Sequence, residues 1–235
     1  IGSVIASTDA ASVFNILKTR NLNLKDNTAS LLELESGSND PISYMLTVVL
    51  VSLMSGSSIS VPALLFQQIF FGLLFGVLIG LIAIWVLRNI NFTISQGQTI
   101  LVFAVAIIAY ALPTAVNGNG YLSVYLCGIL MGNTQIPQKR DLVHFFDVLT
   151  GIAQMMVFFL LGLLVTPTEL PRVFIPALLI MVFLTFVGRP LSVFAVLAPF
   201  RSSLPQIGIV SWAGLRGVAS IVFAIYAVLN RVPLT

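Results

Sequence analysis

The sequence predicts an all-α membrane protein, a multi-spanning helix bundle with discontinuous helices. Of its 235 residues, 58% are hydrophobic and only 8% are charged, whereas about a quarter of the residues are charged in an ordinary soluble domain. Apolar segments near the length that spans a bilayer, about 20 residues, follow one another with short polar gaps. Acids, glycines and prolines interrupt several of these segments. Helices are expected throughout, because lipid does not tolerate an open strand edge.

Eight spans are expected along the chain. They cover about 1–17, 28–54, 62–87, 98–116, 121–132, 142–165, 173–198 and 206–229. The fifth is short for a span, and no linker or second domain interrupts the series. The chain begins inside an apolar segment without the pattern of a signal peptide. We therefore expect a single transmembrane domain over residues 1–235 that is a fragment of a longer protein.

The basic residues predict the orientation of these spans. The gaps after the first, third, fifth and seventh spans carry Lys18, Arg20, Lys25, Arg88, Lys139, Arg140 and Arg201. The other gaps carry only Arg172 and Arg231. Because cytoplasmic loops are enriched in Lys and Arg, the first set is expected in the cytoplasm. The net charge is only +3 and no basic run exceeds two residues, which argues against a nucleic-acid-binding surface.

The first span contains an acid, Asp9, directly after Ser7 and Thr8. An ionised side chain inside a bilayer is costly and marks function by default. The pattern predicts local unwinding, which would free carbonyl and hydroxyl oxygens to coordinate a cation. The alternative is an ordinary helix start, with Ser7 or Thr8 as the N-cap and Asp9 in the first turn.

The second span holds the densest group of acids, around Glu35 and Asp40. Ser36 and Asp40 share one helix face, whereas Glu35 lies well round the helix, so the two acids are expected to have different roles. Pro41 is expected to bend or open the helix here. The side-chain oxygens of Asp40, of the adjacent Asn39 and of Ser36 would then be hard ligands for an alkali cation. The alternative is a polar knot that joins helices.

The last span carries Arg216 between Gly214 and Gly217, near its middle. An arginine at this depth needs an anionic partner. The acids within reach of the membrane are Glu33, Glu35, Asp9 and Asp40. The glycines allow a second break in a helix. Two broken segments, one early and one late, are typical of inverted-repeat transporters with a site at the membrane midplane.

Two further features bear on the architecture. Arg189, followed by Pro190, either lines an inner funnel or snorkels to the cytoplasmic surface. Gly72, Gly76 and Gly80 recur every four residues, which predicts close helix packing or a subunit contact. The sequence shows no Walker loop and no Ser-His-Asp order, so we do not expect an enzyme or an ATP-driven pump.

Three motifs together resemble the monovalent cation:proton antiporter family, closest to its NhaP-like bacterial branch, which includes potassium/proton antiporters. They are Thr8-Asp9, Glu35-Ser36-Gly37-Ser38-Asn39-Asp40 and Gly214-Leu215-Arg216-Gly217. The resemblance covers essentially the whole chain. It implies an inverted-repeat antiporter fold, usually a homodimer, in which this chain supplies the fifth to twelfth of thirteen helices. The first core helices and the C-terminal end would then be missing. Ala10 departs from the family, which often has Pro there.

The resemblance also implies roles for individual residues. The acid matching Asp40 binds the cation or the proton, and Thr8, Asp9 and Ser36 complete the site. An alkali cation would lie at Asp40, Thr8 and Ser36. Glu35 and Arg216 would form a structural ion pair. Asn39, a neutral residue beside Asp40, would leave one exchangeable charge there, which argues for electroneutral exchange.

We therefore expect a secondary transporter that exchanges K+ or Na+ for H+ across the cell (inner) membrane, by competition at Asp40 with alternating access. Its ligands would be the transported ions, with no cofactor, and its surroundings the lipid bilayer. One alternative is a cation channel, although a Thr-Val-Gly-Tyr-Gly filter is missing. Another is a carrier of small organic anions, although the core has more acids than arginines. A third is a non-transporting helical subunit, which would not explain why acids and breaks coincide.

Overall fold

The computed structural model describes residues 1–9, 24–25, 27–55, 60–90, 95–200 and 202–230. Every regular element in these ranges is helical. The helices are α1 (Gly2–Ile5), α3 (Thr28–Met54), α4 (Val61–Asn89), α5 (Ser95–Ala115), α6 (Gly120–Gly132), α7 (Lys139–Leu164), α8 (Leu170–Phe183), α9 (Arg189–Leu197), α10 (Leu204–Trp212) and α11 (Val218–Leu229). A π-helical turn (Leu184–Gly188) joins α8 to α9, and a 3-10 turn (Ala198–Phe200) follows α9. The prediction of an all-α protein is confirmed.

Four helical stretches in the described ranges are long and apolar enough to cross a membrane. They are Val61–Asn89, Gln96–Ala115, Lys139–Leu164 and Leu170–Phe200. Gly120–Gly132 and Val218–Leu229 are shorter apolar helices. The helix α3 has 27 residues, about 40 Å of rise, but carries three acids. The later half of the first expected span, residues 10–17, and four basic topology markers, Lys18, Arg20, Arg201 and Arg231, lie outside the described residues.

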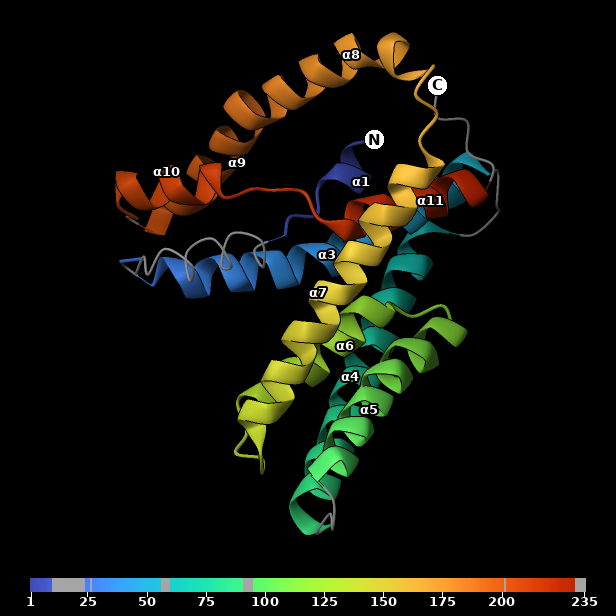
Figure 1. Cartoon of the computed structure of the whole chain (residues 1–235), viewed down its shortest axis with the longest axis vertical. Helices are drawn as coiled ribbons and strands as arrows, with labels where there is room; N and C mark the ends of the chain where they lie inside the picture. The colour runs from blue at the N-terminus through green and yellow to red at the C-terminus, as the bar shows by residue number, and fades with distance from the viewer. Residues whose placement is uncertain (10–23, 26, 56–59, 91–94, 201, 231–235) are drawn as a thin grey trace.

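The helices form two groups (Figure 1). In one, α4, α5 and α6 pack along one another as a bundle. In the other, α1 and α11 both contact α3, and α10 packs on α9. The helix α7 runs between the groups and contacts both α5 and α11. The helix α8 arches away from the rest of the described chain, and its side chains are exposed.

The bundle is held by close backbone contact between α4 and α6. A Cβ atom on Gly72 would lie 3.0 Å from the carbonyl oxygen of Asn119, and one on Gly76 would lie 2.8 Å from that of Ser123. Gly80, two turns further along than Gly72, is buried in the same way. Small residues let helices approach closely and gain van der Waals contact in lipid. The three glycines therefore serve helix packing within the chain. The alternative, that they form a subunit contact, is wrong, because α6 covers this face of α4.

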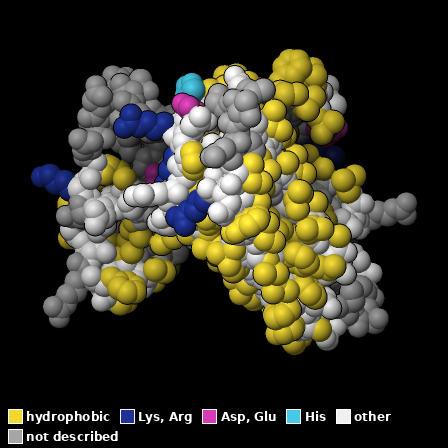
Figure 2. All heavy atoms as spheres, turned by 90° about the horizontal axis from the view of Figure 1, so that it is seen from below, with side chains coloured by type: hydrophobic (Ala, Val, Ile, Leu, Met, Phe, Trp, Pro, Cys, Tyr) yellow, Lys and Arg dark blue, Asp and Glu magenta, His cyan; other side chains and the backbone are white. Residues whose placement is uncertain are grey.

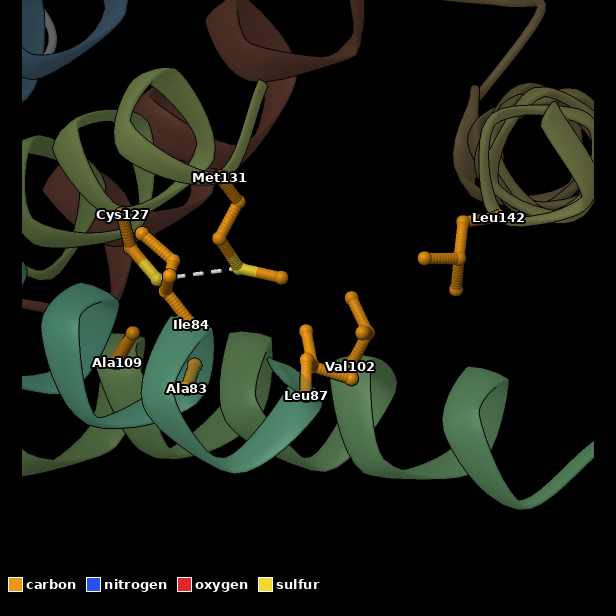
Figure 3. Packing of buried hydrophobic residues seen from close by; sticks show 8 residues of the cluster. All are labelled: Ala83, Ile84, Leu87, Val102, Ala109, Cys127, Met131 and Leu142. Atoms are coloured by element: carbon orange, nitrogen blue, oxygen red, sulfur yellow. Dashed lines mark hydrogen bonds between the residues drawn. The ribbon is translucent and has the colours of Figure 1, made fainter. Parts of the chain in front are cut away.

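An apolar cluster completes the bundle (Figure 3). Its buried members are Ala83, Ile84, Leu87, Val102, Ala109, Cys127, Met131 and Leu142. Outside this cluster, large apolar side chains such as Phe66, Met155 and Leu164 are exposed, and hydrophobic atoms cover much of the face seen in Figure 2. An apolar exterior of this kind is what a lipid environment requires.

Pro41 was expected to bend or open α3; the helix stays continuous through it, so the opening is wrong, and the bend stays a prediction. A neighbour that is distant in sequence contacts the helix at this point: the Asn119 side chain donates to the carbonyl oxygen of Pro41 at 2.8 Å. Gly37, one turn earlier, makes room for the ring of Tyr125 from α6. The two contacts hold α3 close to α6 at positions just before and just after Asp40.

Candidate functional site

Two helix breaks meet at the centre of the second group. After α1 ends at Ile5 the chain is non-helical to Asp9, and residues 213–217 separate α10 from α11. The backbone N–H of Asp9 donates to the carbonyl oxygen of Leu215 at 2.8 Å. A Cβ atom on Gly217 would lie only 2.5 Å from that of Asp9, so a glycine is needed at this crossing. The expected unwinding before Asp9 and the expected late break are confirmed, and the two stretches touch each other. The alternative helix start, with Asp9 in its first turn, falls on residues 10–23, which lie outside the described residues.

The Arg216 guanidinium bonds to backbone oxygens in the early break. Its Nη1 donates to the carbonyl of Ile5 and, at 3.2 Å, to that of Ser7. These carbonyls lie where α1 ends, and a cation is favourable beside the unsatisfied carbonyls of a helix C-terminus. The prediction of an ion pair between Arg216 and Glu35 is therefore wrong. Arg216 lies against the non-helical residues that follow α1 and bonds to backbone oxygens there.

Glu35 instead pairs with Arg189. The two guanidinium nitrogens Nη1 and Nη2 donate to Oε1 and Oε2 at 2.8 and 2.9 Å, and the two side chains are only 13% (Arg189) and 29% (Glu35) exposed. Such a two-point contact between guanidinium and carboxylate is among the strongest polar contacts in proteins. The alternative that Arg189 snorkels to the surface is wrong. Arg189 does line a cavity of about 550 Å³ with Arg216 and Trp212, and its role in a funnel stays a prediction.

Local backbone structure directs Arg189 to this partner. The π turn ends at Gly188, and the N–H of the next residue, Arg189, donates to the carbonyl oxygen of Leu184 five residues earlier. Pro190 lacks an N–H and crowds the preceding turn, which explains why the regular ladder widens here. Gly214 in the late break leaves space for the guanidinium, since a Cβ atom there would lie 2.6 Å from Nε of Arg189.

Asp40 lies against the early break. Its Oδ1 accepts a hydrogen bond from the hydroxyl of Ser7. On the same face of α3, the Ser36 hydroxyl donates to the carbonyl oxygen of Thr8 at 2.8 Å. Ser7 and Thr8 are buried, with 1% and 3% of their surface exposed. The structure therefore brings together the expected residues of the first and second spans.

The Thr8 hydroxyl and the Asn39 amide face the ion pair. The Thr8 hydroxyl donates to Oε1 of Glu35 at 3.2 Å and accepts from Nδ2 of Asn39. Nδ2 of Asn39 also donates to Glu35 Oε1 at 3.2 Å. Glu35 and Asp40 thus have different partners, as their positions round the helix predicted. Asn39 supports Thr8 and the ion pair.

A cavity of about 400 Å³ joins the predicted residues. Its polar lining comes from Ser7, Thr8, Asp9, Ser36, Asp40, Thr150 and Gln154. Carboxylate, hydroxyl and carbonyl oxygens are the hard ligands that alkali cations take. Four predicted site residues, Asp40, Asp9, Thr8 and Ser36, line this cavity, whereas Asn39 and Glu35 do not. The described part of the chain contains no cluster of His, Cys, Asp and Glu suited to a transition metal.

Sequence reasoning missed the roles of two residues of this cavity. Ser7 is predicted only as part of the unwound stretch, yet its hydroxyl bonds Asp40. Gln154 of α7 donates from Nε2 to Oδ2 of Asp9 at 3.2 Å. The available signal was a glutamine in the middle of an otherwise apolar span, which needs a polar partner inside the protein.

Comparisons with known proteins agree with this arrangement. The family model described as "sodium/hydrogen exchanger, transmembrane" matches residues 1–234. The K(+)/H(+) antiporter NhaP of Alkalimonas amylolytica is 37% identical over 236 residues, which cover 99% of this chain and 41% of that protein. NhaP2 of Shewanella oneidensis, also a K(+)/H(+) antiporter, is 35% identical over 240 residues with the same coverage.

A solved structure, that of the sodium proton antiporter MjNhaP1 from Methanocaldococcus jannaschii, superposes with a TM-score of 0.83 and 25% identity. The match covers 98% of this chain and 60% of that one, and the expected antiporter fold is confirmed. The chain spans about two fifths of the length of the curated relatives it matches. By the family model and these relatives, it belongs to the sodium/hydrogen exchanger transmembrane family.

Proposed function

We propose that the protein to which this chain belongs exchanges a monovalent cation, K+ or Na+, for H+ across a membrane, by competition at Asp40. The observation that carries this proposal is the cavity where two helix breaks bring two carboxylates, Asp9 and Asp40, together with hydroxyl and carbonyl oxygens. The names of the relatives, K(+)/H(+) and sodium proton antiporters, support the same exchange. They do not favour a channel or an anion carrier.

The contacts suggest how one site serves two ions. A proton or a cation can neutralise the Asp40 carboxylate, but not both at once. The Ser36 hydroxyl and the Thr8 carbonyl, which bond each other, would both offer oxygen to a cation once that hydroxyl turns. A cavity holding uncompensated carboxylates is costly to carry through the membrane. Alternating exposure of an occupied cavity would therefore couple the two fluxes.

The neighbours of Asp40 support one-for-one, electroneutral exchange. Glu35 is neutralised by Arg189. The amide nitrogen of Asn39 donates to Thr8 and Glu35, and the side chain carries no charge. On α3, this leaves Asp40 as the acid that faces the cavity.

The chain is a membrane protein by its family and its helices. We place the protein in the cell membrane, because bacterial antiporters of the NhaP type are among its relatives. A homodimer remains a prediction.

The test uses the full-length protein in vesicles that contain a pH-sensitive dye. A K+ or Na+ gradient should drive proton flux in the native protein. Asp40→Asn should abolish this flux at every pH, because the exchangeable carboxylate is gone. Glu33→Gln is the matched control: Glu33 is an exposed acid on the same helix, and its loss should leave exchange intact. Undiminished exchange by Asp40→Asn would refute the proposal, and cation current without proton flux would indicate a channel.

A further inference from the structure

Most side chains of α7 are exposed, although the helix contacts α5 and α11. Leu142 is the one residue of this helix that is buried among the described residues, and Met155 and Leu163 are about three quarters and two thirds exposed, at 74% and 69%. Between Leu149 and Leu164 the polar side chains are Thr150 and Gln154 alone. A polar side chain in such a helix is expected to turn inward to a partner. Gln154 does so.

The partner of Gln154 is the acid in the early break. Its Nε2 donates to Oδ2 of Asp9 at 3.2 Å across the cavity. The backbone of Asp9 is held independently, by its N–H bond to Leu215. The late break therefore places the Asp9 backbone, whereas α7 orients its carboxylate. Asp40, on the same cavity, has a different donor in Ser7.

We infer that Gln154 is a positioning residue that sets how tightly the site holds its cation, by orienting the Asp9 carboxylate. This inference rests on the proposed function. Hydrogen bonds to ionised carboxylates are strong and geometrically defined, and binding groups work only when neighbouring contacts hold their geometry. Without the amide, the Asp9 carboxylate loses a contact that fixes its orientation, and its oxygens must be ordered anew each time a cation binds.

The first test compares transport kinetics of full-length variants in vesicles. Gln154→Met keeps the shape of the side chain but removes the N–H donor. The apparent KM for K+ or Na+ should rise about tenfold, the change expected when one hydrogen bond to a charged group is lost. Vmax should stay within about twofold. Met155→Leu, on the exposed side of α7, is the control and should match the native protein. An unchanged KM would overturn the inference, as would a fall in Vmax and melting temperature at constant KM.

The second test exchanges the lengths of the two side chains. Asp9→Glu lengthens the acid by one methylene, and Gln154→Asn shortens the amide by one. Each single change should raise KM, and the double variant should recover most of the loss, because the donor again reaches the carboxylate. Additive losses in the double variant would show that Gln154 does not act through Asp9. If the native protein itself shows no exchange, the proposed function fails; if it exchanges ions normally but Gln154→Met does not alter KM, only this inference fails.

Discussion

The α4–α6 bundle and the crossing of α1, α3 and α11 are held together by different forces. In the bundle, glycines bring two backbones into contact around an apolar cluster. At the crossing, carboxylates, hydroxyls and broken backbone are each held by a specific partner from another element. The comparison indicates that packing gives the first region its rigidity, whereas in the second the fixed geometry comes from polar contacts that also form the cavity.

The largest loss of stability should come from breaking the ion pair. Glu35→Gln leaves Arg189 without its anionic partner. Removing one partner of a buried pair costs about 3–5 kcal/mol, and the partial exposure of Glu35 (29%) puts the expected cost near the lower end, about 3 kcal/mol. Unfolding of the purified protein in detergent, followed by circular dichroism, would measure it.

Glu33→Gln is the control for this change. Glu33 lies two residues away on the same helix and is exposed, so its loss should leave the melting temperature nearly unchanged. Equal melting temperatures for the two variants would contradict the account of the ion pair.

A smaller loss should come from overpacking the bundle. In Gly76→Ala the new methyl group would lie 2.8 Å from the backbone oxygen of Ser123, so α4 and α6 must separate. Overpacking typically costs about 1–3 kcal/mol. The apparent KM for the cation should not change, because the cavity is not lined by Gly76. Unfolding and vesicle assays on the same preparation would compare the two effects.

Gly128→Ala is the control for Gly76→Ala, because it changes helix propensity without changing the packing of one helix against another. Gly128 lies on α6, and a methyl group there would meet no atom of the described residues within 4 Å. The substitution should therefore be neutral or slightly stabilising, because alanine loses less conformational freedom in a helix than glycine does. If both alanines destabilised the protein equally, close α4–α6 contact could not be the cause.

Among the destabilising changes, the smallest loss of stability should come from the link between the two regions. Asn119 caps α6 through the N–H of Leu122 and also donates to the Pro41 carbonyl. Asn119→Ala removes both contacts and should cost about 1–2 kcal/mol, in the range of a lost N-cap. Asn119→Ser keeps a capping hydroxyl but does not reach Pro41, and should cost less. Thermal unfolding would rank the variants; a serine variant as unstable as alanine would mean that the contact with Pro41 dominates.

Much of the fold was predictable, because apolar length and glycine or acid interruptions determine where membrane helices run and break. The two breaks, at residues 6–9 and 213–217, were found in this way. The grouping of Asp40, Asp9, Thr8 and Ser36 followed from the resemblance of their motifs to a known family, and the structure places all four on one cavity.

The predictions that were wrong or incomplete concerned contacts between segments that are distant in the sequence. Arg216 was predicted as the partner of Glu35, whereas Arg189 was predicted to line a funnel or to snorkel. Spacing alone does not reveal a π turn that directs Arg189 to Glu35. The contact of Asn119 with the Pro41 carbonyl joins positions 78 residues apart. Gln154 was missed because its contact with Asp9 spans 145 positions.

The hydrogen bond between the Asp9 N–H and the Leu215 carbonyl joins the broken helices through main-chain atoms alone. No side-chain atom takes part in it, so among replacements of Asp9 only proline removes the donor itself. Substitutions that alter which ion the cavity prefers can therefore leave this backbone hydrogen bond between residues 6–9 and 213–217 in place.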